Sequence, residues 1–378
     1  MEKKKILVVS MSAELGGIEK SLINFLNFLE KEDCETDLLL WKKQGELLPS
    51  IPQNVHFIDN VAPGNLREII KERKYRNFLA YLKLKFFNVF QMPWKALQKI
   101  DKKYDIAVSY TQDGYSPYFV IDNVCADRKF LWYHHGAYSK SEDKRKQDNR
   151  YYSKFTKIIS VSESNKDMLI NNFRSIQDKF IVIKNLINEE QIIELAQEQC
   201  SVFEGFDGCK ITTVGRVSPE KGQLNALDAA KELKDRGFCF KWCFVGDGPE
   251  MASCIGKVKA LDLEDKCIFV GAQANPYPYI EAADLYVQLS FVEADPVTIQ
   301  EALVLDKTIV ASNIAPMEEA LRDNPRGRLC ATDCNEAAEA ITDAANDVLL
   351  KGKNESKSQK TNVRNQLIEE KLQQLFEF

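Results

Sequence analysis

Short apolar runs recur along this chain without alternating with polar residues, and this pattern limits the folds that the chain can adopt. Seven such runs occupy residues 4–10, 36–41, 55–59, 104–110, 129–135, 157–162 and 180–185. Five more occupy residues 209–215, 241–248, 266–271, 284–290 and 308–313. Strands that are apolar on both faces belong to parallel sheets covered by helices. Polar or helical segments separate the runs, so the sequence predicts an α/β protein with doubly wound sheets.

A polar, helical stretch at residues 186–208 separates the two series of strands. A chain of 378 residues is also too long for one ordinary core. We therefore predict a first domain at 1–188 and a second at 189–350. Residues 351–378 form a polar linker and a helix that we expect to pack back on the first domain. Its apolar stripe consists of Val363, Leu367, Ile368, Leu372, Leu375 and Phe376.

Composition excludes several classes of protein. The net charge of −5, from 51 basic and 56 acidic residues, argues against a general nucleic-acid binder. No stretch has 18 uninterrupted apolar residues, so we expect no transmembrane helix. The first apolar run is short and followed by polar residues, which favours a buried strand over a signal peptide. We expect a cytoplasmic protein whose ten cysteines are free thiols.

The stretch GRVSPEKG, residues 215–222, follows a predicted strand. Gly215 would let the backbone turn at the carboxyl edge of the sheet, where ligands bind in such folds. Arg216 and Lys221 place two cations on this loop. A guanidinium fork and an ammonium point charge together suit a diphosphate. A solvated turn with surface charges explains the stretch equally well when it is taken alone.

The stretch SFVEADPVTIQEAL, residues 290–303, also follows a predicted strand. We expect Asp295 to cap a helix whose first residue is Pro296. Free N–H groups near Val297 and Thr298, together with the helix dipole, would then attract an anion.

Two carboxylates flank this predicted helix start. Glu293 precedes the cap and Glu301 lies within the helix. Carboxylates accept hydrogen bonds from paired sugar hydroxyls. A diphosphate on the helix start would therefore leave one carboxylate for each flanking sugar. The alternative is a loop glutamate and a surface glutamate with no ligand.

Together these motifs resemble the retaining glycosyltransferases of family 4, whose GT-B fold has two Rossmann-like domains facing a central cleft. The resemblance covers nearly the whole chain, and the E-x7-E pair with the GR-x4-KG loop is its most specific part. Its remaining pieces are GGIEKSLINFLNFL (16–29), VSES (161–164), VIKNLIN (182–188), VGDGPE (245–250) and GRLC (327–330).

The resemblance implies a role for each matching position. Arg216 and Lys221 would hold the donor's diphosphate, Glu301 the ribose hydroxyls, and Glu293 would face the donor sugar. Gly16 and Gly17 match a glycine loop that approaches the donor phosphates and the acceptor. The expected donor-binding residues are Gly16, Gly17, Gly215, Arg216, Lys221, Glu293, Pro296, Val297, Thr298 and Glu301.

His134 and His135 fall where the family often has a histidine near the reacting sugar. We take His135 as the catalytic candidate beside Glu293, Arg216 and Lys221. A buried structural role for one histidine of the pair is the alternative.

The sequence departs from the family wording E-G-F-P at residues 293–296. Ala294 has less backbone freedom than glycine. Asp295 replaces an apolar residue, and we expect it to add negative charge beside an anionic ligand. This departure bears on which donor the protein binds.

The resemblance implies transfer of a sugar from a nucleoside diphosphate sugar, UDP- or GDP-linked, to a hydroxyl acceptor with retention at the anomeric carbon. Bacterial polysaccharide or glycolipid synthesis is the commonest setting of the family. A GT-B nucleotide-sugar epimerase and a non-catalytic GT-B partner subunit are the alternatives. The chain has no Asp-x-Asp pair, so we expect neither a metal nor a cofactor.

Residues 61–105 carry 11 basic and four acidic side chains, and aromatic residues lie among the lysines. Such a segment suits peripheral contact with anionic lipid at the inner face of the membrane, which would bring the enzyme to a lipid-linked acceptor. A basic helix that packs its apolar side on the first domain is the alternative.

Overall fold

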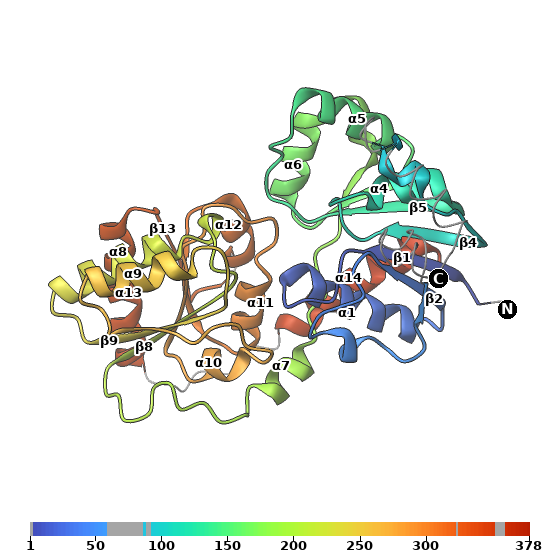
Figure 1. Cartoon of the computed structure of the whole chain (residues 1–378). Coiled ribbons are helices and arrows are strands. Elements are labelled where there is room, and N and C mark those ends of the chain that lie inside the picture. Colours follow the sequence, from blue (N-terminus) through green and yellow to red (C-terminus); the bar gives the residue numbers. More distant parts are fainter. Residues whose placement is uncertain (1–2, 59–85, 88–91, 323, 352–359) are drawn as a thin grey trace, which may run out of the picture.

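The computed structural model describes residues 3–58, 86–87, 92–322, 324–351 and 360–378, which form two α/β domains (Figure 1). The first contains a parallel sheet of seven strands in the order β3-β2-β1-β4-β5-β6-β7. These strands are β1 (Lys5–Ser10), β2 (Glu35–Leu40), β3 (His56–Phe57), β4 (Ile100–Ser109), β5 (Val124–Tyr133), β6 (Lys157–Ser160) and β7 (Phe180–Val182).

The second domain contains a parallel sheet of six strands in the order β10-β9-β8-β11-β12-β13. These are β8 (Cys209–Val214), β9 (Phe240–Val245), β10 (Cys267–Phe269), β11 (Leu285–Gln288), β12 (Thr308–Ser312) and β13 (Gly327–Cys330). The predicted pair of doubly wound parallel sheets is confirmed. Sequence analysis missed β13, which pairs with β12 at the edge of the described sheet. Only one of its four residues is buried, so it lacks the apolar run that marks the other strands.

Helices connect the strands and cover both sheets. In the first domain they are α1 (Gly17–Lys31), α4 (Ser116–Asn123), α5 (Glu142–Tyr152) and α6 (Glu163–Asn172). The connection between the domains has α7 (Glu189–Leu195), and the second domain has α8 (Gln223–Asp235), α9 (Met251–Ala260), α10 (Tyr277–Glu281), α11 (Val297–Val304), α12 (Ala315–Leu321) and α13 (Cys334–Lys351). The last helix, α14 (Lys360–Phe376), packs on the first domain. Short 3-10 turns occur at Leu48–Ser50, Pro93–Ala96, Arg174–Lys179 and Pro219–Lys221.

Strand β1 shows why the apolar runs do not alternate. Ile6 and Val8 pack in one apolar cluster, and Leu7 and Val9 pack in another on the opposite face of the sheet. All four side chains are fully buried. Both faces of this interior strand are therefore covered, as the pattern predicts.

The last helix, α14, lies beside α1 in the first domain (Figure 1). Ile368, Leu372 and Phe376 are buried in the same apolar cluster as the inward face of α1. The ring of Phe376 lies 5.4 Å from Phe130 and 6.0 Å from Phe25. The end of the chain thus completes the core of the domain in which the chain begins.

Most of the basic segment 61–105 lies outside the described residues, namely 61–85 and 88–91, so its contact with lipid stays a prediction. Its described end includes Trp94, which is 1% exposed and stacks on Tyr118 with ring centroids 4.3 Å apart. Trp94 therefore belongs to the core rather than to a lipid-facing surface. Within the described ranges, no helix is long and apolar enough to cross a membrane.

The packing of α14 yields a first prediction. Phe376→Ala should lower the free energy of unfolding by about 3–5 kcal/mol, because it empties a fully buried aromatic site. Leu367→Ala, on the same helix but 54% exposed, should change it by less than about 0.5 kcal/mol. Urea unfolding followed by circular dichroism measures both values. Equal losses in the two variants would contradict this packing.

Candidate active site

The loop after β8, residues 215–222, is packed closely against its neighbours. Gly222 has a φ of +71°, and a Cβ there would lie 2.2 Å from the carbonyl oxygen of Leu289. Gly246 has a φ of +143°, and a Cβ there would lie 1.9 Å from the carbonyl oxygen of Gly215. Gly215 itself has open space around its Cα. Gly222 and Gly246 are therefore the positions in this region that require glycine, whereas Gly215 does not.

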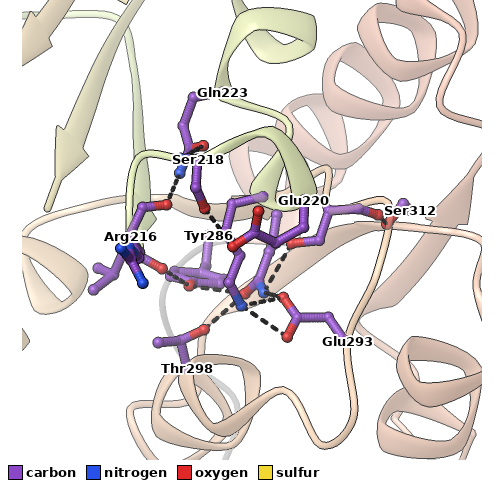
Figure 2. A network of polar contacts seen from close by, with 12 residues as sticks. Arg216, Ser218, Glu220, Gln223, Tyr286, Glu293, Thr298 and Ser312 are labelled. Carbon is purple, nitrogen blue, oxygen red and sulfur yellow. Dashed lines mark hydrogen bonds and ion pairs between the residues drawn. The ribbon is translucent and has the colours of Figure 1, made fainter. Parts of the chain in front are cut away.

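Lys221 and Glu293 form an ion pair across two loops. The Lys221 Nζ donates to both carboxylate oxygens of Glu293, at 2.6 and 2.8 Å. The Nε2 of Gln288 donates to the same carboxylate at 2.7 Å. Figure 2 shows Glu293 within this polar network. Because the Glu293 side chain is only 7% exposed, both donors are needed to compensate the buried charge.

Gln288, at the end of β11, links this pair to helix α11. Its Oε1 accepts hydrogen bonds from the Thr298 hydroxyl at 2.8 Å and from the Tyr286 hydroxyl at 3.1 Å. Thr298 is therefore linked to the Glu293 carboxylate through Gln288. Sequence analysis missed Gln288, because a glutamine inside an apolar strand gives no signal of its own.

Arg216 differs from Lys221 in its surroundings. Its side chain is exposed, and across the described part of the chain no ion pair to its guanidinium is found. Its carbonyl oxygen accepts a hydrogen bond from the Nε2 of Gln223 at 2.9 Å, which fixes the backbone. The loop thus carries one cation already neutralised by Glu293 and one that is free to meet an anion.

The start of α11 differs from the prediction. The helix begins at Val297, its N-cap residue is Pro296, and no side chain caps it. Asp295 does not cap because its Oδ2 accepts hydrogen bonds from the Nδ2 of Asn185 at 2.8 Å and from the Asn185 N–H at 3.3 Å. Burial raises the pKa of Asp295, although nearby Arg364 and Asn185 oppose that effect. Asp295 therefore pairs with Asn185 rather than capping α11, and the expected effect of its charge on an anionic ligand stays a prediction.

Glu301 is deeply buried, with 2% exposure. Its Oε1 accepts hydrogen bonds from the Nζ of Lys20 at 2.8 Å and from the Tyr277 hydroxyl at 3.0 Å. Burial and the adjacent carboxylate raise the pKa of Tyr277, so this hydroxyl stays protonated as a donor. The other oxygen, Oε2, is buried and has no hydrogen-bond partner in the described structure.

The first domain touches the segment 293–301 at several points. A Cβ at Gly136 would lie 2.0 Å from the carbonyl oxygen of Glu293. The Ser162 hydroxyl donates to the carbonyl oxygen of Ala294 at 2.6 Å, and the Ala294 side chain packs into the core cluster of the first domain. This packing gives a physical reason for alanine at position 294 where the family has glycine.

The predicted glycine loop meets the second domain at α11. Gly16 is the N-cap residue of α1, and its backbone is extended. The position of a Cβ on Gly17 would be 3.9 Å from the Cγ2 of Val297. The N-terminal ends of α1 and α11 therefore lie side by side, one from each domain. Both leave N–H groups unpaired within their helices, which favours an anion between them.

The two histidines have different environments. His134 is buried, and burial together with the neighbouring His135 lowers its pKa to about 3, so it remains neutral. Its backbone N–H donates to the Oε1 of Gln112 at 2.9 Å. The ring of His135 is 51% exposed, and its Nε2 lies 3.3 Å from the Oδ2 of Asp113. Burial raises the pKa of Asp113, but His135, Lys140 and the Thr111 hydroxyl together outweigh burial, so that pKa is lowered overall.

The structure thus joins Lys221, Glu293 and Thr298 in one network, and it places Gly17 against Val297. Within the described residues, no hydrogen bond or ion pair joins His135 to that network, and its partner is Asp113. Lys20 and Tyr277 were missed by sequence analysis. Only the approach of the two domains brings Lys20 to Glu301.

Two family models match the chain. "Glycosyltransferase Family 4" matches residues 15–191, and "Glycosyl transferases group 1" matches residues 207–366. The matches coincide with the two domains and together span most of the sequence.

Curated relatives share low identity over parts of the chain. An uncharacterized glycosyltransferase of Methanocaldococcus jannaschii is 24% identical over 48% of this chain and 44% of its own length. A Campylobacter jejuni protein, N-acetylgalactosamine-N,N'-diacetylbacillosaminyl-diphospho-undecaprenol 4-alpha-N-acetylgalactosaminyltransferase, is 26% identical over 43% of this chain and 42% of its own. The chain therefore spans less than half the length of these relatives.

Solved structures match over almost the whole chain. A glycosyltransferase from Rickettsia africae has a TM-score of 0.71 at 19% identity and covers 100% of this chain and 98% of its own. Anabaena HepE in complex with UDP and glucose has a TM-score of 0.66 at 20% identity and covers 98% of this chain and 100% of its own. These likenesses confirm the predicted GT-B fold.

The contact at Gly136 yields a second prediction. Gly136→Ala should destabilise the protein by about 1–3 kcal/mol, because the new methyl group overlaps the Glu293 backbone. Gly256→Ala, within α9 and with open space at its Cα, should instead stabilise by up to about 1 kcal/mol. Thermal unfolding measures both changes. A Gly136→Ala protein as stable as the wild type would contradict the close contact between the domains.

Proposed function

The chain belongs to the glycosyltransferases of the GT-B fold, and on that premise we propose that it moves a sugar from a nucleoside diphosphate sugar to a hydroxyl acceptor with retention at the anomeric carbon. The observation that carries this proposal is the segment 293–301. It places a buried carboxylate, Glu301, whose Oε2 has no hydrogen-bond partner in the described structure, on the same short helix whose N-terminus meets that of α1. The exposed cation Arg216 lies on the loop that is ion-paired to the start of this segment.

The donor fits these groups in a definite order. The diphosphate binds to the guanidinium of Arg216, the ammonium of Lys221 and the N–H groups near Val297. The ribose hydroxyls bind the Glu301 carboxylate, and the donor sugar contacts the Glu293 carboxylate. UDP- or GDP-linked sugars are the proposed donors, and Lys221 is shared between Glu293 and the phosphate when the donor binds.

The leaving phosphate gains negative charge as the bond to the anomeric carbon breaks, so Arg216 and Lys221 act where charge develops. Glu293 favours the positive charge that develops on the sugar. We propose His135 for contact with the donor sugar or acceptor, since His134 is buried and neutral. A glycan or lipid-linked acceptor is proposed, in polysaccharide or glycolipid synthesis.

The experiment that tests this function starts with a thermal-shift panel of UDP, GDP, ADP and CMP, because a ligand that binds only the folded state raises the melting temperature. Turnover with the matching nucleotide sugars and candidate acceptors follows. Nucleotide release that depends on acceptor, with an α-linked product from an α-linked donor, supports the proposal. Release of nucleotide in the absence of acceptor, together with formation of an epimerised sugar, contradicts it.

The two glutamates yield a third prediction. Glu301→Ala should weaken binding of the bare nucleoside diphosphate roughly tenfold or more, because it removes charge-assisted hydrogen bonds worth about 1.5–3 kcal/mol each. Glu293→Ala should leave nucleotide affinity nearly intact and reduce turnover instead. Calorimetric titration with nucleotide alone, beside a turnover assay, separates the two effects. Unchanged nucleotide affinity and unchanged activity in both variants would contradict the proposed roles of Glu293 and Glu301.

The cations yield a fourth prediction. Because Arg216 and Lys221 can neutralise the diphosphate, turnover should be unaffected by EDTA. The control adds Mn²⁺ or Mg²⁺ back after chelation. Loss of activity in EDTA with recovery on adding either ion would show that a metal is required.

A further inference from the structure

The ion pair between Lys20 and Glu301 joins the two domains at the proposed ribose site. Lys20 lies one turn into α1 of the first domain, and Glu301 lies on α11 of the second. Their charged atoms are 2.8 Å apart, with the side chains 21% and 2% exposed. The Lys20 Nζ also lies 4.7 Å from the centroid of the Tyr277 ring, and Tyr277 donates to the same carboxylate oxygen.

Both described donors to Glu301 use a single oxygen. Lys20 and Tyr277 contact Oε1, whereas Oε2 is buried without a partner. A buried acceptor without a donor is costly, so its presence points to a ligand hydroxyl that completes it. Glu301 also borders a cavity of about 120 Å³, lined from the first domain by Lys20 and Ile23 and from the second by Tyr277 and Val297.

Lys20 has two effects on this carboxylate. It compensates a charge that burial would otherwise penalise heavily. It also fixes the plane of the carboxylate, since two donors on one oxygen hold the other in a set direction. Both effects require the first domain to lie against the second, because Tyr277 alone remains when the domains separate.

We infer that Lys20 is a positioning residue that holds the Glu301 carboxylate for the ribose hydroxyls and so makes nucleotide binding depend on closure of the two domains. This inference rests on the proposed function, because it assigns the ribose to Glu301. It adds that the nucleotide site of the second domain is incomplete without a side chain from the first.

The test compares a nucleotide with an analogue that lacks the ribose hydroxyls. Calorimetry first identifies which of UDP, GDP and ADP binds the wild type most tightly. The same nucleotide and its 2',3'-dideoxy form are then titrated into wild type and Lys20→Met. Lys20→Met should weaken the ribonucleotide about tenfold, the equivalent of one charge-assisted hydrogen bond, and should leave the dideoxy form nearly unchanged. A merely structural role would weaken both equally.

Three further variants complete the design. Lys31→Met is the matched control on α1, since Lys31 is 71% exposed and forms a surface ion pair with Glu369 that contributes little; it should change neither affinity. Lys20→Gln keeps a donor without the charge and should give a smaller loss, which also covers the case that Lys20→Met does not fold. In a Glu301→Gln background, Lys20→Met should have no additional effect.

The outcomes separate this inference from the proposed function. Tight nucleotide binding by the wild type with an unchanged ribose preference in the Lys20 variants overturns the inference alone. An equal loss for both nucleotides also overturns it, since Lys20 would then act on the phosphates or on stability. If the wild type binds none of the three nucleotides, the proposed function and the inference both fail.

Discussion

The contact of the segment 293–301 with both domains determines the geometry of the cleft. The side chains and the backbone of this segment together contact residues of both domains. The Glu293 carboxylate pairs with Lys221 of the second domain, while its carbonyl oxygen abuts Gly136 of the first. The next two residues bond to Ser162 and to Asn185. A single short segment therefore carries both proposed binding glutamates and contacts the first domain at Gly136, Ser162 and Asn185.

Charge balance explains the arrangement of cations around this segment. Two buried carboxylates, Glu293 and Glu301, each have one lysine at 2.6–2.8 Å. A buried carboxylate without a compensating cation would be strongly penalised, so each lysine compensates its carboxylate before any ligand binds, and the Lys20–Glu301 pair does so across the two domains. Arg216 has no such partner in the described structure and remains available for an incoming anion. The two ion pairs thus carry no net charge of their own, whereas the exposed Arg216 carries a positive charge.

The sheets and the separate motifs could be predicted from the sequence, whereas the contacts between the motifs could not. Apolar runs such as residues 4–10 predict strands buried on both faces because the pattern is local. The Lys20–Glu301 contact joins residues 281 positions apart, and no local pattern encodes it. Asp295 was predicted as a cap because its spacing before Pro296 fits one, but its tertiary partner Asn185 provides a better donor. The edge strand β13 was missed because only one of its residues is buried.

The central claim is that a nucleoside diphosphate binds between the domains against the segment 293–301. Hydrogen–deuterium exchange with and without the nucleotide that binds most tightly tests this directly. The account predicts slower exchange in three stretches at once: residues 16–20 of the first domain, and 215–222 and 293–301 of the second. Protection confined to the second domain, with residues 16–20 unchanged, would contradict it.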